Sequence, residues 1–138
     1  MFERIVVAVD GSRQGGKTVP VAIDMAITHD SAVTIVHVRE HTRYEGDDVD
    51  LGPEGQSGEE LLTSVLATFQ DAGVSATGEL RRVRPGDTHE QIVEVAEQAD
   101  ADLIIMGTRG MSEFKSLLLG GVANKVVAHA HCSVMLVR

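Results

Sequence analysis

Short, continuous runs of apolar and mostly β-branched residues recur along the chain, and they constrain its fold more than any other feature. The first run, at residues 5–9, reads Ile-Val-Val-Ala-Val, and comparable runs occupy residues 32–38, 103–106 and 134–137. Unbroken apolar runs of this length are typical of strands that are buried on both faces of a parallel sheet. A weaker candidate at residues 77–84 contains a glycine and three arginines, which suits a strand at the edge of the sheet.

The segments between these runs carry apolar residues at helical spacing. One helix face is formed by Val19, Ala22, Ile23, Ala26 and Ile27, and similar stripes follow around residues 61–69, 92–99 and 123–130. Strands therefore alternate with helices, and parallel strands need such crossovers. We predict an α/β fold with an open, doubly wound, five-stranded parallel sheet and helices on both faces, forming one domain over residues 1–138.

The charge and composition exclude several classes of protein. Twelve basic residues stand against 21 acidic residues, which gives a net charge of -9 and argues against binding to nucleic acid. No apolar run reaches the roughly 18 residues that a membrane span needs, and no signal-peptide pattern precedes the first strand. Cys132 is the only cysteine, so an intrachain disulfide is excluded. We expect a soluble, cytoplasmic protein with no membrane association.

Residues 39–58 differ in composition from the rest of the chain. They are rich in glycine and acidic residues and show no periodicity, so they are interpreted as a mobile loop. Either this loop is a solvated insertion without function, or it closes over a ligand or binds a partner.

Two strand ends carry residues suited to ligand binding. In an open parallel sheet, ligands bind beyond the carboxyl ends of the strands, where the winding direction reverses. At the first end, Asp10 is followed by Gly11 and Ser12, and its carboxylate can accept hydrogen bonds from a ribose or a base amino group. At the second end, residues 106–110 read Met-Gly-Thr-Arg-Gly, and Gly-Gly at residues 120–121 opens a helix. Glycines let backbone amides approach a ligand, and a helix amino terminus favours anions, so this segment predicts a phosphate cradle.

A competing motif overlaps the first strand end. Residues 11–18 match the Walker A pattern G-x-x-x-x-G-K-[ST] directly after a buried strand. Catalysis by such a site also needs an acid that supports Mg²⁺ at the end of another strand, and only Glu40 is a candidate. Lys17 is therefore expected on the surface of the first helix, with a Mg²⁺-dependent ATPase as the alternative.

The histidines and serines do not form a convincing catalytic or metal site. His37 and His41 are four residues apart, but the first is predicted in a strand and the second in a loop. No G-x-S-x-G motif is present. Neither a metal site nor a nucleophilic hydrolase is predicted.

Taken together, the motifs resemble those of single-domain universal stress proteins of the ATP-binding kind. The resemblance spans residues 2–138 and rests on the Val-Asp-Gly-Ser opening at residues 9–12, on residues 101–107, and on the G-x2-G-x9-G spacing from Gly107 to Gly120. It implies the strand order 3-2-1-4-5, a homodimer that pairs through Val134–Val137, and a nucleotide site. The residues that the resemblance assigns to this site are Val9, Asp10, Val38, Met106, Gly107, Arg109, Gly110, Gly120, Gly121 and Val122.

One departure from the family pattern bears on the ligand. The family motif continues with Ser or Thr after its last glycine, whereas Gly121 occupies that position here, so a hydroxyl contact to phosphate is missing. We expect an adenine nucleotide as ligand, either ATP or AMP or cyclic AMP, with Mg²⁺ held through the phosphates.

The resemblance implies a regulatory protein of the stress response, with slow or no hydrolysis and no catalytic residue assigned. An unidentified protein partner is part of this expectation. The alternatives are the Mg²⁺-dependent ATPase that uses residues 11–18, and an interaction dimer that binds no nucleotide.

Overall fold

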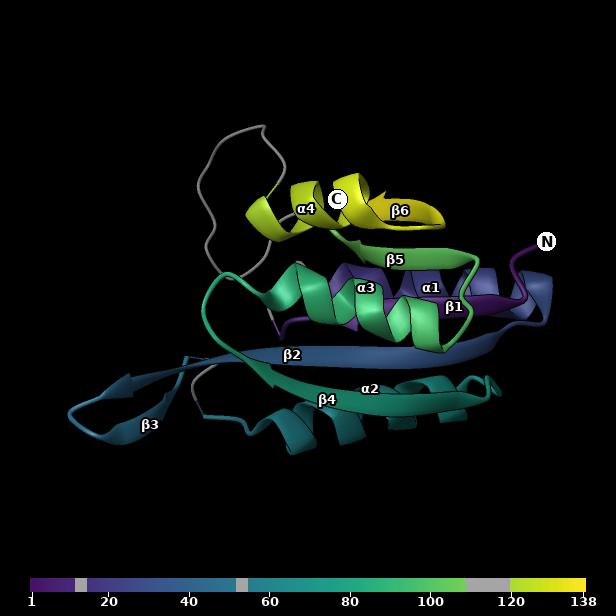
Figure 1. Ribbon diagram of the computed structural model, residues 1–138. Coiled ribbons are helices and arrows are strands. Elements are labelled where there is room, and N and C mark those ends of the chain that lie inside the picture. The colour runs from purple at the N-terminus through teal and green to yellow at the C-terminus, as the bar shows by residue number, and fades with distance from the viewer. Residues whose placement is uncertain (12–14, 52–54, 109–119) are drawn as a thin grey trace.

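The computed structural model describes residues 1–11, 15–51, 55–108 and 120–138 (Figure 1). Within these residues the elements follow one another as β1 (Arg4–Val9), α1 (Gly15–His29), β2 (Ala32–Tyr44), β3 (Asp47–Asp50), α2 (Gly58–Asp71), β4 (Ala76–Val83), α3 (Thr88–Gln98), β5 (Leu103–Gly107), α4 (Gly121–His129) and β6 (Ser133–Val137).

Five of the strands form one parallel sheet. β2 pairs with β4 on one side and with β1 on the other, β1 pairs with β5, and β5 pairs with β6. Counted along the chain without β3, this is the order 3-2-1-4-5, as predicted. β4 and β6 are the two ends of this parallel sheet.

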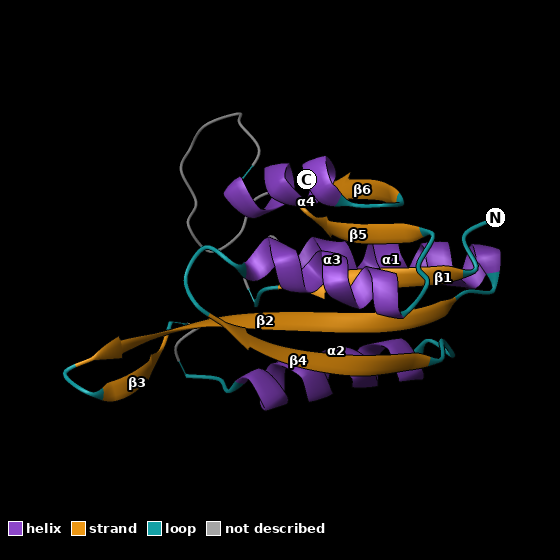
Figure 2. Cartoon of the chain, viewed as in Figure 1, coloured by secondary structure: helices purple, strands orange, loops and turns teal. Residues whose placement is uncertain are grey.

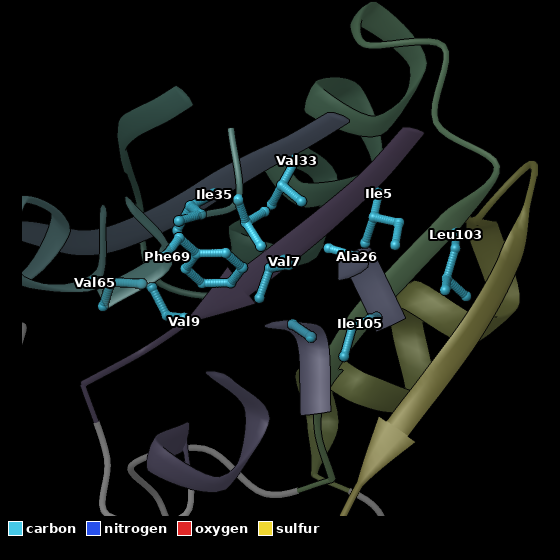
Figure 3. Close-up of a cluster of buried hydrophobic side chains, with 12 residues drawn as sticks. Ile5, Val7, Val9, Ala26, Val33, Ile35, Val65, Phe69, Leu103 and Ile105 are labelled. Atoms are coloured by element: carbon cyan, nitrogen blue, oxygen red, sulfur yellow. The ribbon is translucent and has the colours of Figure 1, made fainter. Parts of the chain in front are cut away.

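The helices cover both faces of the sheet (Figure 2). Side chains of β1 alternate between them: Ile5, Val7 and Val9 pack with α1 and α2, and Val6 packs with α3 and α4. Figure 3 shows the first of these clusters, in which Phe69 of α2 is fully buried. None of the helices in the described ranges is both long and apolar enough to cross a bilayer.

The prediction of a mobile loop over residues 39–58 is wrong for most of that segment. β2 continues to Tyr44 and turns back into the antiparallel β3, so the two strands form a hairpin that projects beyond the other strands (Figure 1). The turn has positive φ at Glu45 and Gly46 (51° and 87°), as a type I′ turn requires. Arg43 is opposite Asp48 in the register of the hairpin, and all four residues of β3 are exposed. The hairpin strands therefore lack the apolar alternation that would have revealed them.

The glycine in β4 has a packing role. A Cβ atom at Gly78 would lie 2.9 Å from Leu66 Cδ1 and 3.0 Å from Leu62 Cγ, both on α2. The missing side chain therefore lets α2 approach the sheet closely. The strand predicted at residues 77–84 is confirmed as an edge strand of the parallel sheet.

Candidate functional site

The carboxyl ends of β1 and β5 lie side by side in the middle of the sheet. Val7 is opposite Ile105 in the parallel register, so Val9 and Gly107 end their strands at the same level. The chain passes from β1 to β2 on one side and reaches β5 and β6 on the other, which makes this edge the switch point of the fold. Asp10 follows β1 directly and is half-buried.

Gly11 provides the turn that leads away from Asp10. Its φ of 81° lies in the left-handed region, which a residue with a side chain adopts only at a cost. This backbone requirement explains why a glycine follows the carboxylate.

The amino terminus of α4 is attached to the end of β5 by the backbone. The Gly120 amide donates to the Thr108 carbonyl oxygen at 2.7 Å, and the Thr108 amide donates to Val137 of β6 at 3.0 Å. Gly120 is the N-cap residue of α4 and provides no side-chain capping bond. The first amides of an α-helix have no acceptor within the helix, so those of Gly121 and Val122 suit an anion.

Three of the other residues assigned to the site lie near these strand ends, and two are not among the residues that the structure describes. Met106 is buried in β5, while Val38 of β2 and Val122 of α4 are half-buried beside the same hydrophobic cluster. Arg109 and Gly110 lie outside the described residues.

Gly121 is the first residue of α4, and it is exposed. A Cβ atom built on it would meet nothing within 4 Å among the described residues. The position at which the family pattern has a hydroxyl therefore has room for one.

The last two residues of the Walker-like segment differ in their exposure. Lys17 is exposed on α1, whereas Thr18 is fully buried, and its hydroxyl has no hydrogen-bond partner among the described residues. Glu40, the candidate acid, accepts hydrogen bonds from the Gly86 amide at 3.2 Å and the Thr88 hydroxyl at 3.0 Å. These contacts direct Glu40 toward the start of α3. Residues 12–14 lie outside the described residues.

Two buried ionisable side chains next to this edge were not predicted. His37 is 1% exposed and Arg39 is 4% exposed, and His37 Nδ1 lies 2.7 Å from the carbonyl oxygen of Val9. Burial holds the pKa of His37 below its ordinary value. Both residues lie on the same strand face as the apolar Val33 and Ile35. Ionisable residues that continue an apolar face are a feature of the sequence from which their burial could have been predicted.

The geometry includes no protein metal centre in the part of the chain that the structure describes. No group of three or more His, Cys, Asp or Glu side chains there is placed to hold a metal ion.

Comparison with known proteins identifies the family. The sequence profile of the universal stress protein family matches residues 1–138, and the chain belongs to this family. It is 32% identical to a universal stress protein of Methanocaldococcus jannaschii over 148 aligned positions, which cover 100% of this chain and 83% of the relative.

Two solved structures share the fold. One is the universal stress protein from Archaeoglobus fulgidus in complex with dAMP, with a TM-score of 0.69, 22% identity, and coverage of 99% of this chain and 98% of that one. The other is a universal stress protein in complex with cAMP, with a TM-score of 0.72, 22% identity, and coverage of 99% and 97%. Members of this family thus bind adenine nucleotides.

Proposed function

We propose that this chain binds an adenine nucleotide at the carboxyl ends of β1 and β5 and acts as a regulatory protein of the stress response. The observation that carries the proposal is the amino terminus of α4, which is attached to the end of β5 by the bond from Gly120 to Thr108. The complexes of family members with dAMP and cAMP support an adenine nucleotide as the ligand.

Each part of the nucleotide has a proposed contact. The Asp10 carboxylate accepts hydrogen bonds from the ribose or the adenine amino group, and the backbone of Val38 meets the adenine edge. Met106 and Gly107 line the sugar. The proposed phosphate contacts are Arg109 and Gly110, which follow β5 in the sequence, and the first turn of α4.

Within that first turn, the amides have different roles. The Gly120 amide already donates to Thr108, so the amides of Gly121 and Val122 bind phosphate. Mg²⁺ accompanies the nucleotide through its phosphate oxygens. Slow or no hydrolysis is part of the proposal, and it is supported by the exposure of Lys17 and by the hydrogen bonds that direct Glu40 toward the start of α3.

Calorimetric titration of two matched variants tests the role of the carboxylate. We expect Asp10→Asn to weaken nucleotide binding about tenfold or more, because a hydrogen bond to a charged group contributes about 1.5–3 kcal/mol. Asp24→Asn, on the exposed surface of α1, is the control and should bind like the parent protein. Equal affinity in both variants would exclude Asp10 as a contact.

Titration and a phosphate-release assay also distinguish our proposal from the ATPase and from an interaction dimer without a nucleotide. The ATPase alternative predicts steady phosphate release that Lys17→Ala abolishes, whereas our proposal predicts unchanged binding in Lys17→Ala. The absence of binding to every adenine nucleotide would favour an interaction dimer without a nucleotide.

We also propose that the chain forms a homodimer through β6, in the cytoplasm. β6 is the last strand of the sheet, and Val134–Val137 are only half-buried, so a second copy can cover an edge that otherwise remains open. Sedimentation should give the mass of a dimer at micromolar concentration, and a monomer would contradict this assignment.

A further inference from the structure

The side chains of His37 and Arg39 form a buried polar connection between two parts of the molecule. Both lie on β2, on the face that is otherwise covered by α1 and α2, and neither belongs to the motifs assigned to the nucleotide. Burying two ionisable groups in an apolar layer is costly unless their hydrogen bonds are satisfied. Their contacts therefore indicate what the two side chains do.

The contacts of His37 fix its protonation state. Its Nδ1 atom lies 2.7 Å from the carbonyl oxygen of Val9, which can only accept, so Nδ1 carries the proton. Its Nε2 atom lies 3.3 Å from Arg39 Nη1, which can only donate, so Nε2 presents its lone pair. His37 is thus a neutral imidazole with one defined tautomer, set by its neighbours on both sides.

Arg39 continues the connection to the β2–β3 hairpin and to the chain before α2. Its Nε atom donates to both carboxylate oxygens of Asp50 on β3, at 3.0 and 2.8 Å, and its Nη2 atom donates to the Gln56 carbonyl oxygen at 3.1 Å. A Cβ atom at Gly58 would lie 2.8 Å from Arg39 Cδ, so this glycine leaves room for the arginine stem. The guanidinium group is therefore held from three directions.

These contacts run without interruption from the end of β1 to the hairpin. Val9, whose carbonyl accepts from His37, directly precedes Asp10, the carboxylate that the proposed function assigns to the nucleotide. We propose that His37 and Arg39 are positioning residues, which form a relay that couples the position of Asp10 to the β2–β3 hairpin. The coupling to nucleotide binding rests on the proposed function, whereas the coupling between β1 and the hairpin does not.

The relay depends on His37 remaining neutral. A second proton would place an N–H group of His37 against an N–H group of Arg39, which removes their hydrogen bond and adds like-charge repulsion. The charged groups that act on His37 are Arg39, which opposes this proton, and Asp10 and Asp50, which favour it. Acidification through the titration range of His37 should therefore shift the Asp10 amide resonance and open the hairpin together.

Reciprocity follows from the coupling. If opening the hairpin weakens nucleotide binding, nucleotide binding must stabilise the closed hairpin by the same factor. The Leu51 amide, which donates to the Glu40 carbonyl oxygen at 2.8 Å beside the hairpin, reports on this state through hydrogen exchange.

The test compares Arg39→Met with Arg82→Met in NMR experiments. Arg82 is an exposed arginine on the neighbouring strand that pairs with Glu59, so it controls for the loss of one positive charge. In the protein without nucleotide, we expect Arg39→Met to raise the pKa of His37, shift the Asp10 amide resonance and accelerate exchange at Leu51. Arg82→Met should change none of the three.

A second variant covers the case in which Arg39→Met fails to fold. Asp50→Asn removes the charge of a half-exposed carboxylate, and it should lower the pKa of His37 further while accelerating exchange at Leu51. If neither the His37 titration nor Leu51 exchange responds to these variants, the relay is overturned.

Nucleotide titrations then separate the relay from the proposed function. We expect the folded relay variants to bind the nucleotide about fivefold more weakly or worse, in the usual range of coupling between sites. Parent-like affinity would overturn the positioning role. If the parent protein binds no adenine nucleotide, the proposed function fails, and the three NMR measurements still decide whether β1 and the hairpin are coupled.

Discussion

The Gly120 amide nitrogen lies 2.7 Å from the Thr108 carbonyl oxygen, so one backbone hydrogen bond joins the two ends of residues 109–119. The first turn of α4 is thereby held beside the carboxyl end of β5, two features that were predicted to cooperate in ligand binding. The first of the following substitutions tests this end of α4, and the others test packing, titration and hydrogen bonding elsewhere in the fold.

Gly121→Ser should strengthen nucleotide binding. No atom of the described residues lies within 4 Å of the new Cβ position, and the serine hydroxyl can donate to a phosphate oxygen. A hydrogen bond to a charged group contributes about 1.5–3 kcal/mol, so calorimetry should show affinity about tenfold higher or more. Ala128→Ser, at the other end of α4, is the control and should leave the affinity unchanged. If Gly121→Ser also leaves the affinity unchanged, phosphate does not bind at this end of α4.

Gly78→Val should destabilise the fold by about 1–3 kcal/mol, because a larger residue is forced against Leu62 and Leu66 of α2. Urea denaturation measures the free energy of unfolding. Gly16→Ala, on the exposed start of α1 with open space around its Cβ position, is the matched glycine control, and it should be neutral or stabilising. Equal stability of Gly78→Val and the parent protein would contradict the close packing of α2 on β4.

Stability should fall in mild acid because of His37. Burial lowers the pKa of His37 in the folded protein below the value of about 6.5 that it has in the unfolded chain. At pH values between these two pKa values, the unfolded chain binds more protons than the folded protein. The free energy of unfolding therefore rises with pH across this range. The stability that neutral His37 contributes is complete above about pH 6.5, and it is lost as the pH falls through the pKa of the folded state. Denaturation series from pH 5 to 7.5 should show this slope, reduced in His37→Gln and retained in His131→Gln. An identical slope in all three proteins would show that His37 is not the titrating group.

Asp102→Asn should loosen the start of β1 and activate Cys132. The Asp102 carboxylate accepts from the Glu3 amide at 2.9 Å and the Arg4 amide at 3.2 Å. Burial and then the charge of Asp102 raise the pKa of the Cys132 thiol, so removing the charge increases the thiolate fraction. We expect faster alkylation of Cys132 and a loss of about 1 kcal/mol in stability.

Asp100→Asn is the control for that substitution, because it removes only an exposed ion pair with Arg4 at 3.6 Å. Its alkylation rate and stability should match the parent protein. The assignment fails if the two aspartate variants behave alike.

The sequence could predict the parallel sheet because the apolar runs and helical stripes report burial directly. It also indicated Asp10, which follows the end of a predicted strand, and the Gly120–Gly121 pair, which opens a predicted helix. It could not reveal the β2–β3 hairpin, because all four residues of β3 are exposed and its sequence, Asp-Asp-Val-Asp, has no apolar face. The role of His37 was also hidden, because its contact with the Val9 carbonyl joins positions 28 residues apart.

Calorimetric titration of the nucleotide-stripped protein with ATP, ADP, AMP and cyclic AMP, with GTP as the base control, tests the central claim most directly. The account predicts saturable binding of at least one adenine nucleotide, weaker binding of GTP, and little or no phosphate release from ATP. Heat changes no larger than those of dilution for every adenine nucleotide would contradict it.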